Sequence, residues 1–170
     1  LAIEAAQIAM GIPPGLNRSF AFEHFKSFDS KRFEGIRFNE ENRINHDCSI
    51  PIICSDRDQG ASEITLRNGA RAGVETILEC THQSLSAARP PTDQGLFLSN
   101  PPYGIRVQSS DSLRNLYATI GRTYREHFDG WVLGIITNDA NLARHTGLNF
   151  KNTSDQIPHG GLKVRLYIRD

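Results

Sequence analysis

The sequence lacks the features of two broad classes of protein. No run of about eighteen apolar residues occurs in the 170-residue chain, so no segment is typical of a membrane-spanning helix. Lysine and arginine together number 19, as do aspartate and glutamate, so no overall positive field would draw the chain onto nucleic acid. Any contact with RNA or DNA must therefore come from a local patch or from another domain.

Cysteine is also scarce. Cys48, Cys54 and Cys80 are odd in number and lack the spacing of metal ligands, which argues against a disulfide framework or a zinc site. Cys54 and Cys80 lie in apolar runs. We therefore expect buried, reduced thiols in a cytoplasmic protein, and no metal.

The N-terminal residues are rich in helix formers. Residues 1–10 have the composition of a helix interior, and no capping residue precedes them. Gly11, Pro13 and Pro14 predict that this helix ends near residue 10. This pattern predicts that the chain is a fragment of a longer protein.

Six phenylalanines lie in a long irregular segment, residues 15–47. We expect short helical pieces here, packed on the body of the protein by the rings of Phe20, Phe22, Phe25, Phe28, Phe33 and Phe38. The same segment holds the best local basic patch, made of Lys31, Arg32, Arg37 and Arg43. Two interpretations remain open: a contact with nucleic acid, or a solvated face between buried phenylalanines.

Strand and helix patterns alternate through the rest of the chain. Strands are expected at residues 49–56, 75–83, 96–99 and 131–139, and helices at residues 61–72, 113–128 and 140–145. Residues 162–169 alternate, and we expect Leu162, Val164, Leu166 and Ile168 to point inward. The pattern predicts an α/β fold with a mostly parallel sheet, helices on both faces and an antiparallel C-terminal strand.

Ligands of open α/β sheets bind at the carboxyl ends of the strands. Asp56 ends the first expected strand, and such an acid can accept hydrogen bonds from both hydroxyls of a ribose. The alternative is that Asp56 or Asp58 only caps the following helix, and this alternative is stronger for Asp58.

Asn100-Pro101-Pro102-Tyr103 ends another strand and suits a planar amine. The Asn100 side-chain oxygen and the Pro101 carbonyl can accept the two hydrogens of an exocyclic amine, and Tyr103 can stack on the base that carries it. Gly104 lets the backbone pass close to a flat ring. The alternative interpretation of these residues is a simple turn.

The segment SNPPYGIR (residues 99–106) resembles the NPPY motif of class I S-adenosylmethionine-dependent methyltransferases that modify amino nitrogens. Four segments in order are similar to the bacterial large-subunit rRNA guanine-N2 methyltransferases, which usually carry an N-terminal THUMP domain. They are IEAAQIAMGIPPGLNRSFAFEHF, CSDRDQGASEITLRNGARAGV, LFLSNPPYGIRV and GGLKVRLYI. The resemblance covers nearly all of the chain.

The resemblance implies a Rossmann-like methyltransferase sheet, S-adenosylmethionine as cofactor, and large-subunit rRNA as partner through an additional N-terminal RNA-binding domain. It implies three groups of site residues. Those for catalysis are Asn100, Pro101, Pro102 and Tyr103; those for the cofactor are Asp56, Arg57, His82, Gln83 and Asn100; those for the substrate are Tyr103, Gly104 and Arg106.

The sequence departs from the family pattern at three points. The glycine-rich donor loop and the first strand are missing before Leu1, so we expect one methyltransferase domain over residues 1–170 that is incomplete at its N-terminus and impaired in donor binding. His82 stands where an acid usually binds the donor's adenine, and it is either a replacement for that acid or a surface histidine. Gly69 stands where a helix former is usual, at a cost of about 1 kcal/mol.

The leading hypothesis is methyl transfer to guanine N2 of rRNA. Three alternatives stay open: N6-adenine transfer to DNA or RNA, methylation of glutamine in a protein, and a degenerate RNA-binding module without catalysis.

Overall fold

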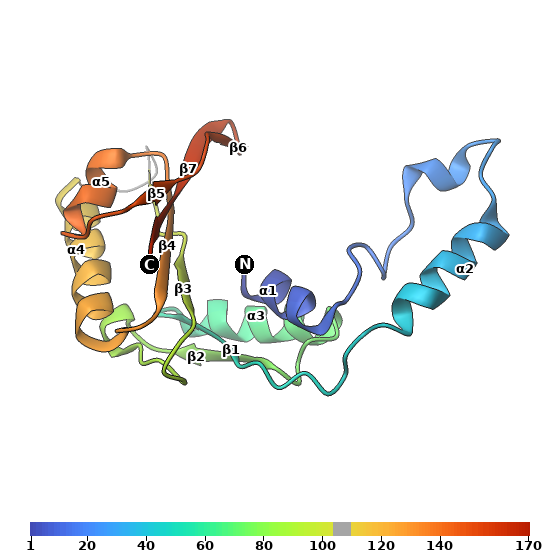
Figure 1. Ribbon diagram of the computed structural model, residues 1–170, viewed down its shortest axis with the longest axis horizontal. Helices are drawn as coiled ribbons and strands as arrows, with labels where there is room; N and C mark the ends of the chain where they lie inside the picture. The colour runs from blue at the N-terminus through green and yellow to red at the C-terminus, as the bar shows by residue number, and fades with distance from the viewer. Residues whose placement is uncertain (104–109) are drawn as a thin grey trace. The chain divides into compact units, whose positions relative to one another are not determined.

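The computed structural model describes residues 1–103 and 110–170, with only the backbone described for Ser110. The chain divides into two compact units, Leu1–Gln83 and Ser84–Asp170, and each is described by itself. The colours of Figure 1 follow the chain through both units.

The first unit is built on two parallel strands, β1 (Ile52–Asp56) and β2 (Leu78–His82). Two helices, α1 (Ala2–Met10) and α3 (Gln59–Arg71), pack on these strands and on each other, and Figure 1 shows them side by side. The small core consists of Ala6, Met10, Val74 and Leu78.

Local sequence explains where α3 begins and why it contains a glycine. The Asp58 side chain accepts hydrogen bonds from the backbone N–H groups of Gly60 (2.8 Å) and Ala61 (3.2 Å), as a helix N-cap does. The capping role expected of Asp58 is therefore confirmed. At Gly69 a Cβ atom would lie 2.5 Å from Leu78 Cδ2, so glycine allows the helix to approach β2 closely.

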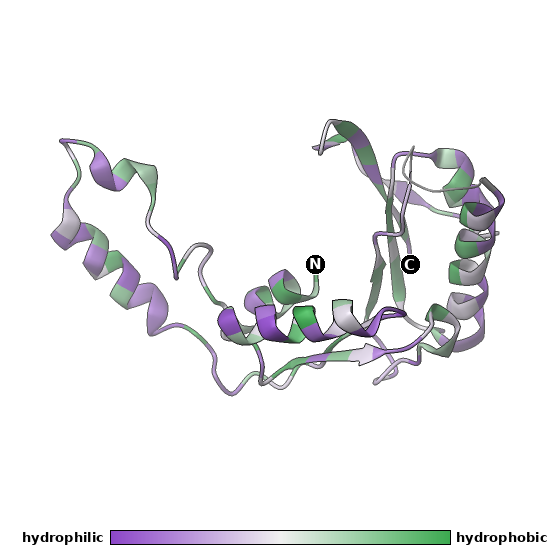
Figure 2. Cartoon of the chain, turned by 180° about the vertical axis from the view of Figure 1, so that it is seen from behind, coloured by the Kyte–Doolittle hydropathy of each residue, from purple (hydrophilic) through white to green (hydrophobic). Residues whose placement is uncertain are grey.

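The phenylalanine-rich segment folds around its own rings. It contains a 3-10 helix, η1 (Ala21–His24), and the helix α2 (Ser30–Glu41), which Figure 2 shows as mostly hydrophilic. The rings that contact one another, with centroids 5.2 to 6.3 Å apart, are those of Phe20, Phe22, Phe28 and Phe33. None of them belongs to the core of the unit. The short helices were predicted correctly, but the expectation that the rings pack on the body was wrong.

The second unit contains a mixed five-stranded sheet. Its strands are β3 (Leu96–Ser99), β4 (Val132–Thr137), β5 (Asn152–Thr153), β6 (Ile157–His159) and β7 (Leu162–Arg169). The order is β3-β4-β7-β5, with β6 also paired to β7. β3 and β4 are parallel, whereas β7 is antiparallel to β4. The predicted α/β class and the antiparallel C-terminal strand are confirmed.

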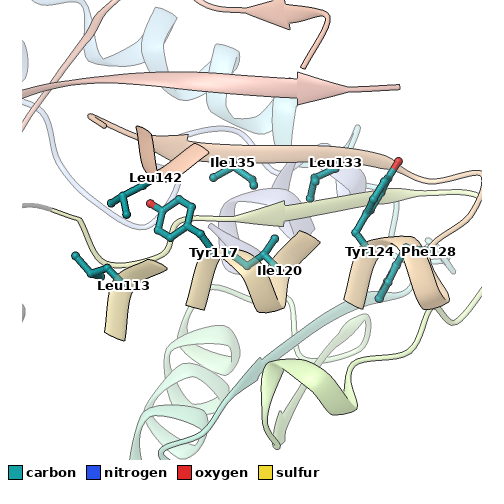
Figure 3. Packing of buried hydrophobic residues seen from close by; sticks show 8 residues of the cluster. All are labelled: Leu113, Tyr117, Ile120, Tyr124, Phe128, Leu133, Ile135 and Leu142. Carbon is teal, nitrogen blue, oxygen red and sulfur yellow. The ribbon is translucent and has the colours of Figure 1, made fainter. Parts of the chain in front are cut away.

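One long helix, α4 (Ser110–His127), covers a face of this sheet. Its apolar side meets β4 and the short helix α5 (Ala140–His145) in a core that Figure 3 shows. The core residues are Leu113, Tyr117, Ile120, Tyr124, Phe128, Leu133, Ile135 and Leu142. The aromatic ends of this core are tied to the backbone, because Tyr124 Oη donates to the Trp131 carbonyl at 2.6 Å.

The expected orientation of β7 is wrong in part. Tyr167 pairs in register with the fully buried Ile135 and its ring contacts Phe150, which packs on the core. Arg169 lies over the Tyr124 ring. Tyr167 and Arg169, which were expected to point outward, thus lie on the side of α4, where long side chains can supply apolar surface, whereas Val164 is buried as expected.

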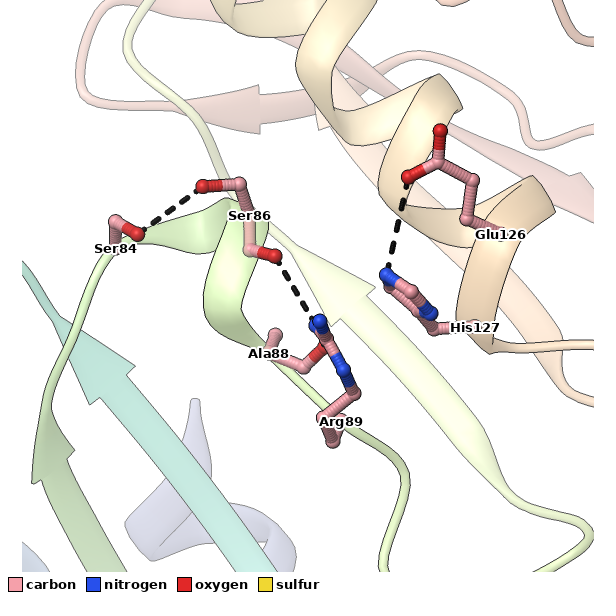
Figure 4. A network of polar contacts seen from close by, with 6 residues as sticks. All are labelled: Ser84, Ser86, Ala88, Arg89, Glu126 and His127. Carbon is pink, nitrogen blue, oxygen red and sulfur yellow. Dashed lines mark hydrogen bonds and ion pairs between the residues drawn. The ribbon is translucent and has the colours of Figure 1, made fainter.

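A short 3-10 helix, η2 (Leu85–Ala87), begins the second unit. Arg89 Nη1 donates to the carbonyls of Ser86 (3.1 Å) and Ala88 (2.8 Å), and the hydroxyls of Ser84 and Ser86 lie 3.1 Å apart, as Figure 4 shows. These bonds stabilise the turn that leads toward β3. No helix in the described part of the chain is both long and apolar enough to cross a membrane.

Candidate functional site

Four residues expected to bind the cofactor meet at the carboxyl ends of β1 and β2. Asp56 and His82 are register partners at the ends of the two strands. The Gln83 backbone N–H donates to the Asp56 carbonyl at 3.0 Å, and His82 Nε2 lies 3.0 Å from the Arg57 carbonyl oxygen. Since a carbonyl can only accept, Nε2 carries the proton, and the imidazole is fixed against the loop after β1.

The Asp56 carboxylate keeps one oxygen available. Its Oδ1 accepts the Asp58 backbone N–H at 2.9 Å, which turns the chain toward the capped start of α3. Among the residues that the structure describes, no donor to Oδ2 is found, and the residue is exposed. Within the described part of the chain, Asp56 therefore combines a fixed orientation with an unused acceptor at the end of a strand.

The expected catalytic residues follow β3 in the second unit. Asn100 is exposed, Pro101 is buried, Pro102 is exposed, and Tyr103 is half-buried against the core under α4. Asn100, expected among both the catalytic and the cofactor-binding residues, thus belongs to this unit. Gly104 and Arg106 lie outside the described residues.

The end of β4 lies beside this segment because β3 and β4 run parallel. The Thr137 hydroxyl accepts the Asp139 backbone N–H at 3.2 Å. The Asp139 side chain in turn accepts from the backbone N–H groups of Asn141 (2.7 Å) and Leu142 (3.3 Å), so it caps α5. Both polar residues of this strand end are used to hold the backbone.

Tyr117 lies at the same end of the unit and is the residue that sequence reasoning missed. It is fully buried, and its hydroxyl has no hydrogen-bond partner among the residues that the structure describes. Burial raises the pKa of Tyr117 to about 12; the nearby Thr137 hydroxyl opposes this rise, whereas Asp139 and Tyr103 add to it. The helical spacing of apolar residues predicted Tyr117 only as a core position. Such spacing does not show whether a buried hydroxyl has a hydrogen-bond partner.

The cysteines are free and half-buried, not fully buried as expected. Cys54 and Cys80 are register partners on β1 and β2. Burial, followed by the hydrogen bond and charge of Cys80, raises the pKa of Cys54 to about 12, so Cys54 is a protonated thiol at neutral pH. Over the described ranges 1–103 and 110–170, no three His, Cys, Asp or Glu side chains converge as metal ligands do.

Comparison with known proteins identifies the family. Residues 1–162 match the family described as UPF0020, RMKL-like, methyltransferase domain. The chain is 32% identical over 168 residues to the ribosomal RNA large subunit methyltransferase K/L of Legionella pneumophila strain Lens, covering 98% of this chain and 24% of that protein. It therefore spans about a quarter of that relative's length.

Solved structures agree with this match. The crystal structure of SMU.472, a methyltransferase complexed with SAH, has a TM-score of 0.90 and 30% identity, covering 98% of this chain and 44% of that one. A structure from Listeria monocytogenes, named as an N6-adenine-specific DNA methylase, has a TM-score of 0.85 and 26% identity, covering 98% of this chain and 42% of that one. The chain belongs to the RMKL-like methyltransferase domain family.

Proposed function

We propose that the intact protein transfers a methyl group from S-adenosylmethionine to an exocyclic amine of an RNA base, namely guanine N2 of large-subunit rRNA. The observation that carries this proposal is the sequence Asn100-Pro101-Pro102-Tyr103 at the carboxyl end of β3 in a member of this family. The name of the Legionella relative supports rRNA as the substrate.

The residues of the first unit fit the donor. Asp56 Oδ2 accepts no hydrogen bond from the residues that the structure describes, and carboxylates at such strand ends accept hydrogen bonds from ribose hydroxyls. Arg57, His82 and Gln83 line the same strand ends and complete the proposed donor-binding residues. When bound, S-adenosylmethionine supplies a methyl group on a sulfonium, which is already a good leaving group.

The residues of the second unit fit the acceptor. Pro101 is buried, which fixes the backbone, whereas Asn100 is exposed and presents its side chain to solvent. The Asn100 oxygen and the Pro101 carbonyl would accept the two amine hydrogens, which directs the nitrogen lone pair outward. The Tyr103 ring would stack on the base, a contact worth about 1 to 3 kcal/mol. The reaction then depends on proximity and orientation more than on a strong base, and the amine releases its proton to water.

A second candidate is N6-adenine methylation, which the name of the Listeria structure favours. Both reactions need the same amine-holding residues, so the base must be identified by experiment. We also propose that residues 1–170 are part of one methyltransferase domain and that an additional RNA-binding domain of the intact protein selects the rRNA site.

The test is mass spectrometry of rRNA nucleosides from a strain that lacks the gene, complemented with the intact wild-type protein or with variants. We expect N2-methylguanosine to return with the wild type and to stay absent with Asn100→Ala, because that variant cannot orient the amine. Asn115→Ala is the matched control, since Asn115 is an exposed residue of α4.

Donor affinity separates the roles of Asn100. The Asn100→Ala protein should bind S-adenosylmethionine as the wild type does, measured by calorimetry. Loss of donor binding together with transfer would show that Asn100 is structural. Return of N6-methyladenosine instead would favour the second candidate, and no change in any nucleoside would indicate a module without catalysis.

A further inference from the structure

A fully buried hydroxyl lies without a partner next to the proposed acceptor site. Tyr117 has no exposed surface, and its hydroxyl makes no hydrogen bond within residues 1–103 and 110–170. Figure 3 shows the ring beside Leu113 and Leu142, with the hydroxyl pointing away from the α4 backbone toward Leu142. Leaving a buried polar group unsatisfied is unfavourable, and phenylalanine would fill the same space without that penalty.

The other buried tyrosine of α4 provides a direct comparison. Tyr124 lies two turns further along the same face of the helix, and its hydroxyl donates to the Trp131 carbonyl at 2.6 Å. Thus one tyrosine has a structural partner at the amino end of β4, and the other has none near its carboxyl end. The difference suggests that the Tyr117 hydroxyl acts in another state of the protein.

The segment Asn100–Tyr103, here called the acceptor segment, has backbone carbonyls that could accept a hydrogen bond from such a hydroxyl. Pro101 and Pro102 have no backbone N–H, so the segment is poor in donors and rich in carbonyl acceptors. Within the described residues, no donor to the carbonyls of Asn100, Pro101 or Pro102 is found. Tyr103 packs on the core cluster to which Tyr117 belongs, so the donor and the segment lie at the same place in the unit.

The remaining neighbours of the hydroxyl are less suitable partners. Thr137 is near enough for its hydroxyl to lower the pKa of Tyr117, but the geometry between the two hydroxyls is not that of a hydrogen bond, and the Thr137 hydroxyl accepts the Asp139 backbone N–H at 3.2 Å. The Asp139 carboxylate caps α5. Both side chains thus already serve the backbone at the end of β4 in the free protein.

We propose that Tyr117 is a positioning residue, whose hydroxyl donates a hydrogen bond to a main-chain carbonyl of the acceptor segment when the target base is bound. This bond would hold Asn100 and Tyr103 in the orientation that transfer requires. The inference rests on the proposed function, because it assigns the acceptor role to this segment.

The test compares Tyr117→Phe with Tyr124→Phe in the intact protein. For Tyr117→Phe we expect an unchanged or higher Tm, unchanged donor affinity, and a kcat lower by about 3- to 10-fold, as for loss of one neutral hydrogen bond. For Tyr124→Phe we expect a Tm lower by about 2 to 4 °C and an unchanged kcat, because its bond is present in the free protein.

Two results would overturn the inference: a loss of Tm in Tyr117→Phe as large as in Tyr124→Phe, or an unchanged kcat. Failure of the wild type to methylate rRNA would instead refute the proposed function. The Tm comparison needs no acceptor, so it still decides whether the Tyr117 hydroxyl is unpartnered in the free protein.

Discussion

Gly121 allows α4 to approach the end of α5 more closely than any other residue could. It lies one turn after Tyr117, and a Cβ atom at this position would be 1.8 Å from the Thr146 carbonyl oxygen and 2.6 Å from its carbonyl carbon. Ordinary contact begins near 3.4 Å. We therefore predict that Gly121→Ala destabilises the second unit.

The backbone that would have to move is firmly held. Thr146 is buried, and its hydroxyl donates to the Ala143 carbonyl at 2.7 Å and accepts the Leu148 N–H at 3.1 Å. Arg125 Nη1 also donates to the Thr146 carbonyl at 3.0 Å. Overpacking of this kind costs up to about 3 kcal/mol, against a gain of about 1 kcal/mol in helix propensity. The net loss is about 2 kcal/mol, which lowers Tm by about 4 to 8 °C in a chain of this size.

The stability of the second unit can be measured selectively through Trp131. It is the single tryptophan of the chain and lies in the second unit, with its indole N–H bonded to the Thr92 carbonyl at 2.9 Å. Thermal unfolding followed by its fluorescence therefore reports this unit. The matched control is Gly35→Ala in α2, where a Cβ atom meets nothing within 4 Å. The control should leave the tryptophan transition unchanged, and a Gly121→Ala protein as stable as the wild type would refute the reasoning.

Two further predictions concern the first unit. Because the pKa of Cys54 is raised from 9.0 to about 12, the folded chain keeps a proton that the unfolded chain loses, so the free energy of unfolding should fall between those pH values. Denaturant titrations across that range should show a smaller fall for Cys54→Ala, and an equal fall in both proteins would contradict the shift. Phe33→Ala should open the phenylalanine cluster at a cost of about 1 to 3 kcal/mol. Limited proteolysis should then cut within residues 15–47 before the rest of the unit, and a cleavage pattern like that of the wild type would argue against a separate cluster.

The regular elements were predictable because they carry strong periodic signals. The strand Leu96–Ser99 and the helix Ala140–His145 have the bounds that the sequence indicated. The strands β5 and β6 were not expected, since two or three residues carry no detectable alternation. The phenylalanine cluster was assigned to the wrong surroundings because composition identifies apolar rings without showing what they contact.

The candidate site residues of the two units were predictable to different degrees. Motif residues at strand ends could be named because sheet topology brings strand ends together, as it does for Asp56 and His82. Tyr117 could not be named from the sequence. What distinguishes it is a buried hydroxyl without a hydrogen-bond partner among the described residues, and this depends on its neighbours in three dimensions. Gly69 shows the same limit, since its departure from the family pattern is explained only by its contact with Leu78.

At His82 the sequence and the structure lead to different interpretations of the residue. In the sequence, histidine at this position departs from the acid expected from the resemblance, which weakens the similarity to the family motif. In the structure its Nε2 is directed at the Arg57 carbonyl, and Nδ1 is the ring nitrogen that this contact leaves unused. We propose that Nδ1 accepts a hydrogen bond from the adenine amine of the donor, as a carboxylate oxygen would at this position. The imidazole also ties the loop after β1 to the end of β2 through its Nε2–H, and an aspartate carboxylate could not do this because it has no hydrogen to donate to a carbonyl.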